Sequence, residues 1–469
     1  MVLSAAVVAV VGPAAPATAA VTPSGSWGNA QLVPGMLALD GGGLARTQTV
    51  SCASAGNCAA GGYYQSKKGW QAFVTDEAGG VWHKAQEVAA ALNLGGNAAV
   101  SSVSCGSAGN CVAGGSSQPK PAAPGSGTQV AFIVTQLHGV WGAAERVPGL
   151  AHLGSDQNSG VTSVSCTSAG NCAIGGSDHG EGFVADKKNG VWSRAEEVPG
   201  LGALSLDNAG VASVSCVSPG NCAAAGSYVA AFGGPIRGFT TDEVGGRWHT
   251  AREVPGTVVN AHGFAEVTSV SCAAAGNCAA VGNYGPASNT MQVFILNEVN
   301  GHWGTAREMP GSGALDHSHG AVDPSVSCAR AGDCAAVGDY STSSSIDQQA
   351  FVIDEKGGVW GQAQAVPGLA ALNTQGYAEI LSVSCAAPGD CAAGGDYLAS
   401  GANQAFVVNE TGGVWGQAQE VPGEAALNTG GVAQLSSVSC LPRGCAAVGS
   451  YTGSGGNAFV VSEAGSPRS

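Results

Sequence analysis

Apolar residues recur along the chain in short alternating stretches that are typical of β-strands. One stretch has the form Ser-Val-Ser-Cys and a second the form Cys-Ala-Ala-x-Gly, while a third centres on a phenylalanine, as in 404–408. A fourth begins with Val-Trp and ends at Pro-Gly, as in 414–423. Alternation of this length predicts half-buried strands, and the Gly, Asn and Pro residues between them predict tight turns.

This unit of four predicted strands recurs about every 55 residues. A valine stands two residues before the first cysteine of each unit, and each third stretch carries one phenylalanine. Eight of the nine tryptophans are in phase, Trp70 being the exception: Trp27, Trp82, Trp141, Trp192, Trp248, Trp303, Trp360 and Trp415. Repeated units of four short antiparallel strands predict the blades of a β-propeller.

The two ends of the chain predict that the ring is closed. The chain enters the repeat on a fourth strand, at 26–35, and leaves it on a third strand, at 458–463. Pairing these segments completes one blade and removes the exposed sheet edges, whereas a linear array would need atypical capping repeats. We therefore predict an all-β protein whose residues 21–469 form a closed eight-bladed β-propeller. Each blade has four antiparallel strands, and the propeller is expected to be a monomer.

The sixteen cysteines form eight closely spaced pairs. Seven pairs have five intervening residues and the last has four: Cys52 with Cys58, Cys105 with Cys111, Cys166 with Cys172, Cys216 with Cys222, Cys272 with Cys278, Cys328 with Cys334, Cys385 with Cys391, and Cys440 with Cys445. Cysteines on either side of a tight turn lie opposite each other in one hairpin, at disulfide distance. Zinc sites usually combine two close pairs, which here would lie on different blades. The pattern therefore favours eight disulfides within blades over metal sites.

Composition and charge exclude several classes of partner. The net charge is −15, and the 17 basic residues are scattered, which argues against nucleic acid. Residues 1–20 combine an apolar run with a small-residue end, Ala19-Ala20, and predict a signal peptide, although no Lys or Arg precedes the run. This run is too short to span a bilayer and no later segment is apolar enough. We expect a secreted, extracellular protein with no membrane insertion and no cofactor.

Differences in loop length predict which face binds a ligand. The spacing from each tryptophan to the next first cysteine is 23 to 25 residues, but from that cysteine to the next tryptophan it is 26 to 36. The variation therefore lies mainly between the second and third strands. In a propeller, this loop and the crossover between blades share one face. Variable loops on a rigid scaffold are common binding sites, so we expect a glycan or an extracellular protein to bind there.

Two recurring polar positions on that face are candidate ligand-binding residues. The crossovers carry Asp40, Asn93, Asn260, Asp316, Asn373 and Asn428. These side chains either form a polar ring for sugar hydroxyls or a cation, or make Asx turns, which the neighbouring glycines favour. The second strands end on Asn283, Asp339 and Asp396, followed by Tyr284, Tyr340 and Tyr397. Such pairs either bind and stack on a glycan or pack between blades.

No motif predicts a specific reaction. The turns at 75–82 and 241–248 resemble the Asp-box of sialidase-like propellers, with Glu in place of the motif's Asp, and this resemblance implies a blade rather than an activity. The arginine triad of sialidases is not recognisable. Segment 409–415 is only faintly similar to the docking motif of quinone-dependent dehydrogenases. Asp316-His317-Ser318-His319 is the only histidine cluster; it could bind a metal, but an isolated loop of this kind is more often solvated.

As a whole, the repeat resembles secreted β-propeller repeat proteins of high-GC actinobacteria, which include sensor and adhesion modules. The resemblance implies the fold and an extracellular location, without a reaction. Three hypotheses remain: a binding module for a glycan or protein, a hydrolase or lyase with its site at the central channel, and a structural protein of the cell envelope. Catalysis would require one or two blades that depart from the others with clustered acids, His or Arg.

Overall fold

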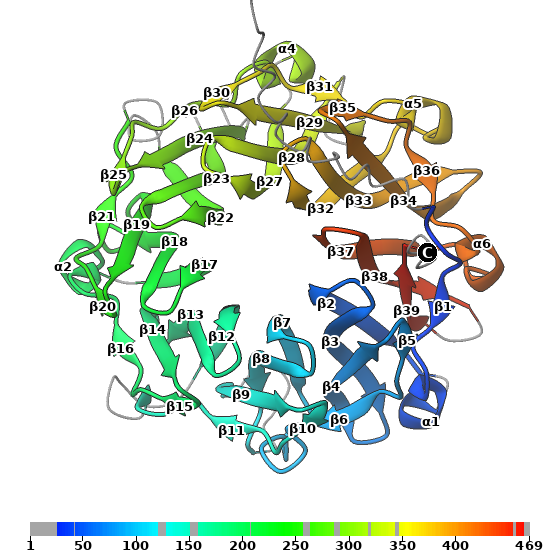
Figure 1. Ribbon diagram of the computed structural model, residues 1–469, viewed down its shortest axis with the longest axis horizontal. Coiled ribbons are helices and arrows are strands. Elements are labelled where there is room, and N and C mark those ends of the chain that lie inside the picture. The colour runs from blue at the N-terminus through cyan, green and yellow to red at the C-terminus, as the bar shows by residue number, and fades with distance from the viewer. Residues whose placement is uncertain are drawn as a thin grey trace, which may run out of the picture.

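The computed structural model describes residues 26–463, except for 42, 121–127, 151–157, 207, 257–262, 286–290, 318–319, 343–346 and 454–455. Four-stranded antiparallel units recur throughout, and we number them 1 to 8 by their cysteine pairs. Figure 1 shows them side by side around a central axis, with the Ser-Val-Ser-Cys strand of each nearest the middle. Within the described residues, no helix has the length and apolar character needed to cross a membrane.

Unit 7 illustrates the topology that the other units share. Its innermost strand β32 (Ala378–Ala387) pairs with β33 (Asp390–Ala399), and β33 pairs with β34 (Ala402–Thr411). Two short strands, β35 (Val414–Trp415) and β36 (Gln419–Glu420), pair with the outer edge of β34.

The corresponding strands of the other units have similar bounds. The innermost strands are β2 (Ala45–Ser54), β7 (Ala98–Ser107), β12 (Ser159–Ser168), β17 (Ala209–Ser218), β22 (Phe264–Ala274), β27 (Ala321–Arg330) and β37 (Ala433–Leu441). The second strands are β3 (Asn57–Ser66), β8 (Asn110–Ser117), β13 (Asn171–Asp178), β18 (Asn221–Val229), β23 (Asn277–Gly285), β28 (Asp333–Ser341) and β38 (Gly444–Thr452). The third strands are β4 (Gly69–Ala78), β9 (Val130–Leu137), β14 (Glu181–Lys188), β19 (Ile236–Val244), β24 (Gln292–Val299), β29 (Gln348–Lys356) and β39 (Gly456–Ser462).

The first and last strands of the described chain belong to the same sheet. Strand β1 (Gln31–Leu32) pairs antiparallel with β39, with Gln31 opposite Val460, and Trp27 bridges to Glu463. The pairing expected between the N-terminal strand and the C-terminal unit is therefore present. Units 4 and 5 are joined into one larger sheet by a single parallel bridge between Ile236 and Phe264.

A ring of serine hydroxyls joins the innermost strands. In each unit, the backbone N–H of the first cysteine donates to the Oγ of the serine that precedes the equivalent cysteine in the unit before it, at 2.8–3.0 Å. The eighth bond runs from Cys52 in unit 1 to Ser439 in unit 8. We call these acceptors the serine ring: Ser51, Ser104, Ser165, Ser215, Ser271, Ser327, Ser384 and Ser439. They explain the second serine of the Ser-Val-Ser-Cys motif.

The first hydroxyl of the motif forms a parallel set of bonds. The N–H of the valine two residues before the cysteine donates to a Ser or Thr hydroxyl of the preceding unit in seven of the eight units. Val103 N–H, for example, donates to Thr49 Oγ1 at 3.3 Å. Innermost strands that are too far apart to form a sheet are thus joined through side-chain hydroxyls.

The in-phase tryptophans also bond between units. Six indole Nε1–H groups donate to a polar side chain of the preceding unit at 2.9–3.3 Å, as Trp415 does to Asp354 Oδ1 and Trp82 to Ser462 Oγ. Trp141 and Trp192 have no such partner among the described residues. The side chains at the acceptor position bond elsewhere, since Asp76 binds His83 and the Thr135 hydroxyl accepts from Lys187.

The fourth strand is split, whereas the sequence predicted one continuous strand. Between β35 and β36 the chain turns toward the preceding unit, where Ala418 N–H donates to Pro367 O at 2.7 Å. Equivalent alanine-to-proline bonds occur at six other junctions, the exception being the junction where Ala89-Ala90 replaces Pro-Gly. Satisfying a neighbouring carbonyl interrupts the strand, and the Pro-Gly signal therefore marks a contact between units as well as a strand end.

Short helices follow Pro-Gly in five crossovers, where the sequence predicted turns alone. They are α1 (Met36–Asp40), α2 (Leu201–Leu204), α4 (Ser312–Asp316), α5 (Leu369–Leu372) and α6 (Glu424–Leu427). The preceding glycine has positive φ in each, for example 79° at Gly35, a conformation that other residues rarely adopt.

All eight predicted disulfides are present, so that prediction is confirmed. The two cysteines of each pair lie directly opposite each other in the register of the first and second strands. The bonds join Cys52 to Cys58, Cys105 to Cys111, Cys166 to Cys172, Cys216 to Cys222, Cys272 to Cys278, Cys328 to Cys334, Cys385 to Cys391, and Cys440 to Cys445.

The second cysteine of a pair is generally the more deeply placed one. Cys58, Cys111 and Cys278, for example, are buried among the core side chains of their hairpins. These disulfides are therefore structural elements of the hairpin. Cys445 differs, because it is only partly buried.

The shorter spacing of the last pair has a local cause. In the other seven units the register shifts by one residue just after the first cysteine, which inserts a β-bulge before the turn. In unit 8 there is no shift at this point, and Leu441 pairs directly with Gly444. Cys445 consequently stays opposite Cys440 although the loop between them is one residue shorter.

The interior of each unit combines a buried phenylalanine with small residues. The eight third-strand phenylalanines are fully buried. Glycine is required beside the bulge in the middle of the innermost strand. A Cβ at Gly62 would lie 1.9 Å from Arg46 O, and one at Gly115 would lie 2.0 Å from Ala99 O.

Substitution of one serine-ring member should test whether the ring is continuous. Ser439→Ala removes the acceptor for Cys52 N–H, and an unsatisfied buried donor costs about 1–3 kcal/mol. We expect the free energy of unfolding in urea to fall as much as in Ser271→Ala, which removes the equivalent acceptor between units 5 and 6. The exposed Ser101→Ala should have little effect. If Ser271→Ala lowered the free energy of unfolding and Ser439→Ala did not, units 8 and 1 would not be joined in solution.

Candidate functional site

The predicted crossover residues lie inside the crossovers, with their side chains buried. Asp40 and Asp316 end α1 and α4, and Asn373 and Asn428 follow α5 and α6 directly. Asn93 donates to Trp70 O at 2.8 Å and to Gln71 Oε1 at 2.9 Å. In the same position, Asn428 donates to Asn403 O at 2.8 Å and to Gln404 Oε1 at 3.2 Å. Asn260 lies outside the described residues.

These contacts favour the turn interpretation of the crossover position. Asn93 Oδ1 also accepts the backbone N–H of Asn97 at 2.8 Å, which closes the turn. The amide therefore fastens the crossover to the start of the third strand in the unit that the crossover leaves. A role of this row in ligand binding stays a prediction.

The predicted tyrosines pack between strands. Tyr284, Tyr340 and Tyr397 are at most 7% exposed. The Tyr284 ring centroid lies 6.4 Å from that of Phe294, and Tyr397 lies as close to Phe406. The Tyr397 hydroxyl donates to Glu420 at 3.3 Å, and burial raises the pKa of this hydroxyl above its usual value. The covered rings favour the packing role, and stacking on a glycan stays a prediction for them.

The polar position at the end of the second strand differs in kind around the molecule. It faces the second residue of the innermost strand across the sheet, and in units 2, 3 and 4 these pairs are Ala99/Ser116, Gly160/Ser177 and Gly210/Ser227. In units 5, 6, 7 and 8 they are Glu266/Asn283, Val322/Asp339, Glu379/Asp396 and Gln434/Ser450. We call the face that carries the crossovers and the loops between second and third strands the loop face. One side of it is thus lined by small residues and the other by acids and amides.

Glu379 is the centre of the acidic side. Its Oε2 accepts from the Tyr377 hydroxyl at 2.8 Å, and its Oε1 accepts from Gln434 Nε2 of unit 8 at 2.5 Å. Asp396 lies beside it across the strand pair and accepts from Asn403 Nδ2 at 2.9 Å. In unit 6, Asp339 accepts the backbone N–H of Ile380 at 2.9 Å. We call Asp323, Asp339, Glu379 and Asp396 the carboxylate cluster.

Burial raises the pKa of three acids in the cluster. Burial, followed by the charge of Glu379, raises the pKa of Asp396 to about 8. Burial also raises the pKa of Asp339 well above its usual value and that of Asp323 to a lesser extent, with Glu379 adding to both. Two adjacent carboxyl groups that share a proton can both donate and accept hydrogen bonds, and one can serve as a general acid.

The sequence identified part of this cluster. Asp339 and Asp396 belong to the predicted row, but Glu379, Asp323 and Gln434 do not. The signal for Glu379 and Gln434 is the strand register, because the residue after the buried alanine of the innermost strand lies opposite the predicted row. Asn283 is buried, and its amide donates to Glu266 at 3.4 Å.

Unit 1 presents aromatic side chains on the same face. Tyr63 occupies the position of Asp396 and contacts Trp70 edge to face, with ring centroids 5.2 Å apart. Both rings are partly exposed, and Arg46 lies opposite Tyr63 across the strand pair. Trp70, the only tryptophan outside the repeat pattern, is therefore on the loop face near the predicted site.

The histidine cluster is only partly described. Asp316 is buried, whereas the neighbouring His317 is exposed and has a positive φ of 47°. Ser318 and His319 lie outside the described residues. Binding of a metal by this segment stays a hypothesis.

Several cavities among the described residues lie on the face opposite to the predicted one. Four of them occur between neighbouring units at the tight turns, each lined by half-cystines and by acids at the end of the third strand. Their volumes are about 10 Å³ between units 3 and 4, 310 Å³ between 4 and 5, 230 Å³ between 5 and 6, and 250 Å³ between 6 and 7. We call these cavities the turn-face grooves. Tight turns leave this edge open, because no long loop covers the gap between units.

Carboxyl pairs bridge three of the turn-face grooves. They are Asp186/Glu243, Asp242/Glu298 and Asp354/Glu410, each with one residue from either unit. Burial, followed by the charge of the aspartate, raises the pKa of each glutamate to about 7. In the sequence, Asp242 and Glu243 stood out only as part of the Asp-box-like turn at 241–248.

Comparison with known proteins identifies the fold. No protein-family model and no curated protein sequence matches the chain. Among solved structures, the Dos1 propeller is 11% identical over 90% of this chain and 93% of its own, with a TM-score of 0.50. Chaetomium thermophilum Sqt1, bound to the N-terminus of the ribosomal protein L10, is 10% identical over 90% and 98%, also at 0.50. The fold is a β-propeller.

Each unit is thus a propeller blade, and blades keep the numbers of their units. A third structure, Penicillium chrysogenum α-L-arabinanase with arabinobiose, covers 93% of this chain and 98% of its own at 9% identity, with a TM-score of 0.43. Identities this low show the fold alone.

The carboxyl pairs should make stability depend on pH. Between pH 4.5 and about 7, unfolded glutamates release a proton that Glu243, Glu298 and Glu410 retain in the folded state. Their contribution to the free energy of unfolding therefore falls as the pH rises and levels off above 7. Each unit of pKa shift corresponds to about 1.4 kcal/mol. Urea denaturation from pH 4.5 to 8.5 should show this slope, and Glu410→Gln should reduce it. The exposed Glu196→Gln serves as the control, and equal slopes in both variants would contradict the assignment.

Proposed function

We propose that this protein is a secreted, closed eight-bladed β-propeller that binds a glycan at the carboxylate cluster on its loop face. Residues 1–20 would be the signal peptide and 21–469 the propeller, alongside the secreted actinobacterial propeller repeats that its sequence resembles. The observation that carries the binding site is the asymmetry of the loop face, where acids and amides replace the small residues of blades 2, 3 and 4.

Closure of the ring is supported by bonds that return to the starting blade. The serine ring has eight members, and its last bond joins blade 8 to blade 1. Trp82 in blade 1 donates to Ser462 in blade 8, and Ala85 N–H donates to Pro34 O. These contacts lie at different distances from the axis, so they support closure independently.

A secreted location is supported by the disulfides. Eight are present and none of the sixteen cysteines is free. Disulfides persist in oxidising compartments outside the cytosol.

The chemistry of the cluster supports a polyhydroxylated ligand. The Asp396 carboxyl, whose pKa is raised to about 8, lies beside the Gln434 and Asn403 amides, so donors and acceptors lie side by side, as vicinal sugar hydroxyls require. The Asp339 Oδ2 and Asp396 Oδ1 atoms are buried, and neither accepts a hydrogen bond from the described residues. The partly exposed Tyr63 and Trp70 rings of blade 1 offer an aromatic surface on the same face.

Glycan binding can be measured on an array with the oxidised protein, followed by calorimetry on the best ligand. Glu379→Gln and Asp396→Asn should weaken binding at least tenfold, because both remove a carboxyl group that forms hydrogen bonds with the ligand or with neighbouring side chains. Ser227→Ala changes the same position in blade 4 and should leave the affinity unaltered. Binding to no glycan, or equal loss in Ser227→Ala, would contradict the proposal.

A second candidate function is hydrolysis or elimination on the bound glycan. The observation in its favour is the Glu379/Asp396 pair, in which Asp396 keeps its proton at neutral pH and can donate it to a leaving group. New reducing ends or unsaturated products from a polysaccharide panel would reveal the activity. It should fall as the pH rises through about 8 and be lost in Asp396→Asn. Binding without any product at any pH would leave the protein a binding module.

A further inference from the structure

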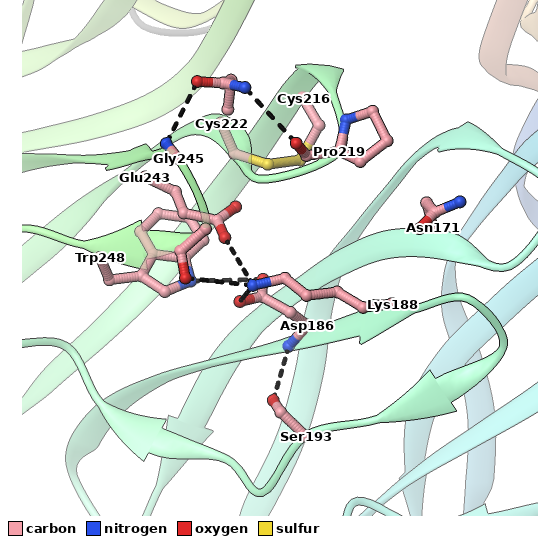
Figure 2. Close-up of polar contacts among 12 residues, drawn as sticks. Asn171, Asp186, Lys188, Ser193, Cys216, Pro219, Cys222, Glu243, Gly245 and Trp248 are labelled. Atoms are coloured by element: carbon pink, nitrogen blue, oxygen red, sulfur yellow. Dashed lines mark hydrogen bonds and ion pairs between the residues drawn. A yellow bond between two sulfur atoms is a disulfide. The ribbon is translucent and has the colours of Figure 1, made fainter.

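The turn-face groove between blades 3 and 4 is occupied by a lysine of the protein itself. Figure 2 shows Lys188 extending from β14 toward Asp186 and Glu243, below the Cys216–Cys222 disulfide. Its Nζ lies 3.5 Å from Asp186 Oδ2 and 3.4 Å from Glu243 Oε1, and it donates to Gly246 O at 3.1 Å. An ammonium group therefore bridges the carboxyl pair and the backbone carbonyl of the next turn.

The same arrangement recurs between blades 6 and 7. Lys356 holds the position of Lys188, and its Nζ donates to Gly413 O at 2.9 Å. The carboxyl pair there is Asp354/Glu410, and the charge of Lys356 lowers the pKa of both acids against the effect of burial. Two separate junctions thus place an alkylammonium group at the same point.

The groove between blades 4 and 5 has the acceptors but lacks the lysine. Asp242 and Glu298 form its carboxyl pair, and Gly301 occupies the place of Gly246 and Gly413. Val244 stands where the other two junctions have Lys188 and Lys356, and its side chain is 56% exposed. Asp242 accepts from Trp303 Nε1 at 3.2 Å.

Glu298 lacks a partner in this groove. The residue is 3% exposed, and its carboxylate has no hydrogen bond or ion pair among the described residues. His249 and Arg252 lower the pKa of Asp242, and neither is among the groups that shift the pKa of Glu298. The groove has a volume of about 310 Å³, enough for several non-hydrogen atoms, and its wall includes Val217 and Ala274 beside the disulfides.

We propose that the groove between blades 4 and 5 binds an alkylammonium group supplied by another molecule. The ammonium would take the position of Lys188 Nζ, between Asp242, Glu298 and the Gly301 carbonyl, with its alkyl chain against Val217 and Ala274. This site lies on the turn face and is separate from the carboxylate cluster. The chemistry fits both a free amine and a lysine side chain of a partner protein.

An ammonium fits the groove better than a divalent cation. The protein places lysine ammonium groups at this point in two other junctions, where each donates to a glycine carbonyl. The Asp242 oxygens are held by Trp303 Nε1, at 3.2 and 3.3 Å, and this donor would have to be displaced for bidentate metal binding.

Calorimetry on the intact oxidised protein at pH 8 tests the proposal. The probes are cadaverine, Nα-acetyl-lysine amide and calcium chloride. We expect saturable binding of the amines that is weakened at least tenfold by Glu298→Gln. Val244→Lys should abolish it, because the new side chain reproduces Lys188 and fills the site from within. Binding of the lysine amide more tightly than cadaverine would point to a protein partner, and the reverse order to a free amine.

Val299→Lys is the matched control. Val299 holds the same position one blade later and is 57% exposed, so the variant adds an equal charge beside a different groove. Amine affinity should survive in Val299→Lys, and urea denaturation should show that all three variants remain folded. Amine binding that persists in Val244→Lys, binding lost equally in Val299→Lys, or calcium binding without amine binding would each overturn the proposal.

Discussion

Each blade has backbone N–H donors whose acceptors are supplied by the neighbouring blade. The innermost strands are too widely separated to share a sheet, so the N–H groups of the cysteines and valines donate to hydroxyls of the blade before. Further out, indole N–H groups reach a neighbouring polar side chain, and alanine N–H groups reach a proline carbonyl. Since buried donors without partners are costly, a blade is stable only between two others. The repeated residues therefore make the contacts between blades as well as the strands within each blade.

A binding site on this scaffold requires residues that depart from the repeat pattern. The contacts between blades are made by serine, tryptophan and proline, whose roles are the same in nearly every blade. The loop-face positions vary from blade to blade, and there blades 6 and 7 carry Asp323, Asp339, Glu379 and Asp396. At the turn-face position that holds Lys188 in blade 3 and Lys356 in blade 6, blade 4 carries Val244. Both proposed sites are places where a few blades differ from the rest.

The sequence predicted the repeat, the disulfides and the pairing of the two ends, because each depends on spacing along the chain. It did not predict the split fourth strand, since the carbonyl that interrupts it belongs to another blade. Glu379 escaped notice for a related reason: its partner Asp396 is seventeen positions away, and only the strand register brings them together. The turn-face grooves were missed because uniform tight turns give no signal in loop length, although short turns are what leaves the grooves uncovered.

The disulfides lie within hairpins and cross no boundary between blades. Covalent bonds therefore protect each blade but not the assembly, which is held by hydrogen bonds and packing. Strand β1 lies antiparallel to β39, with Trp27 beside Glu463, so the two ends of the described chain emerge at one joint. A force applied to these ends would peel that strand pair apart one bond at a time. A force applied to one end alone would leave that strand pair unloaded.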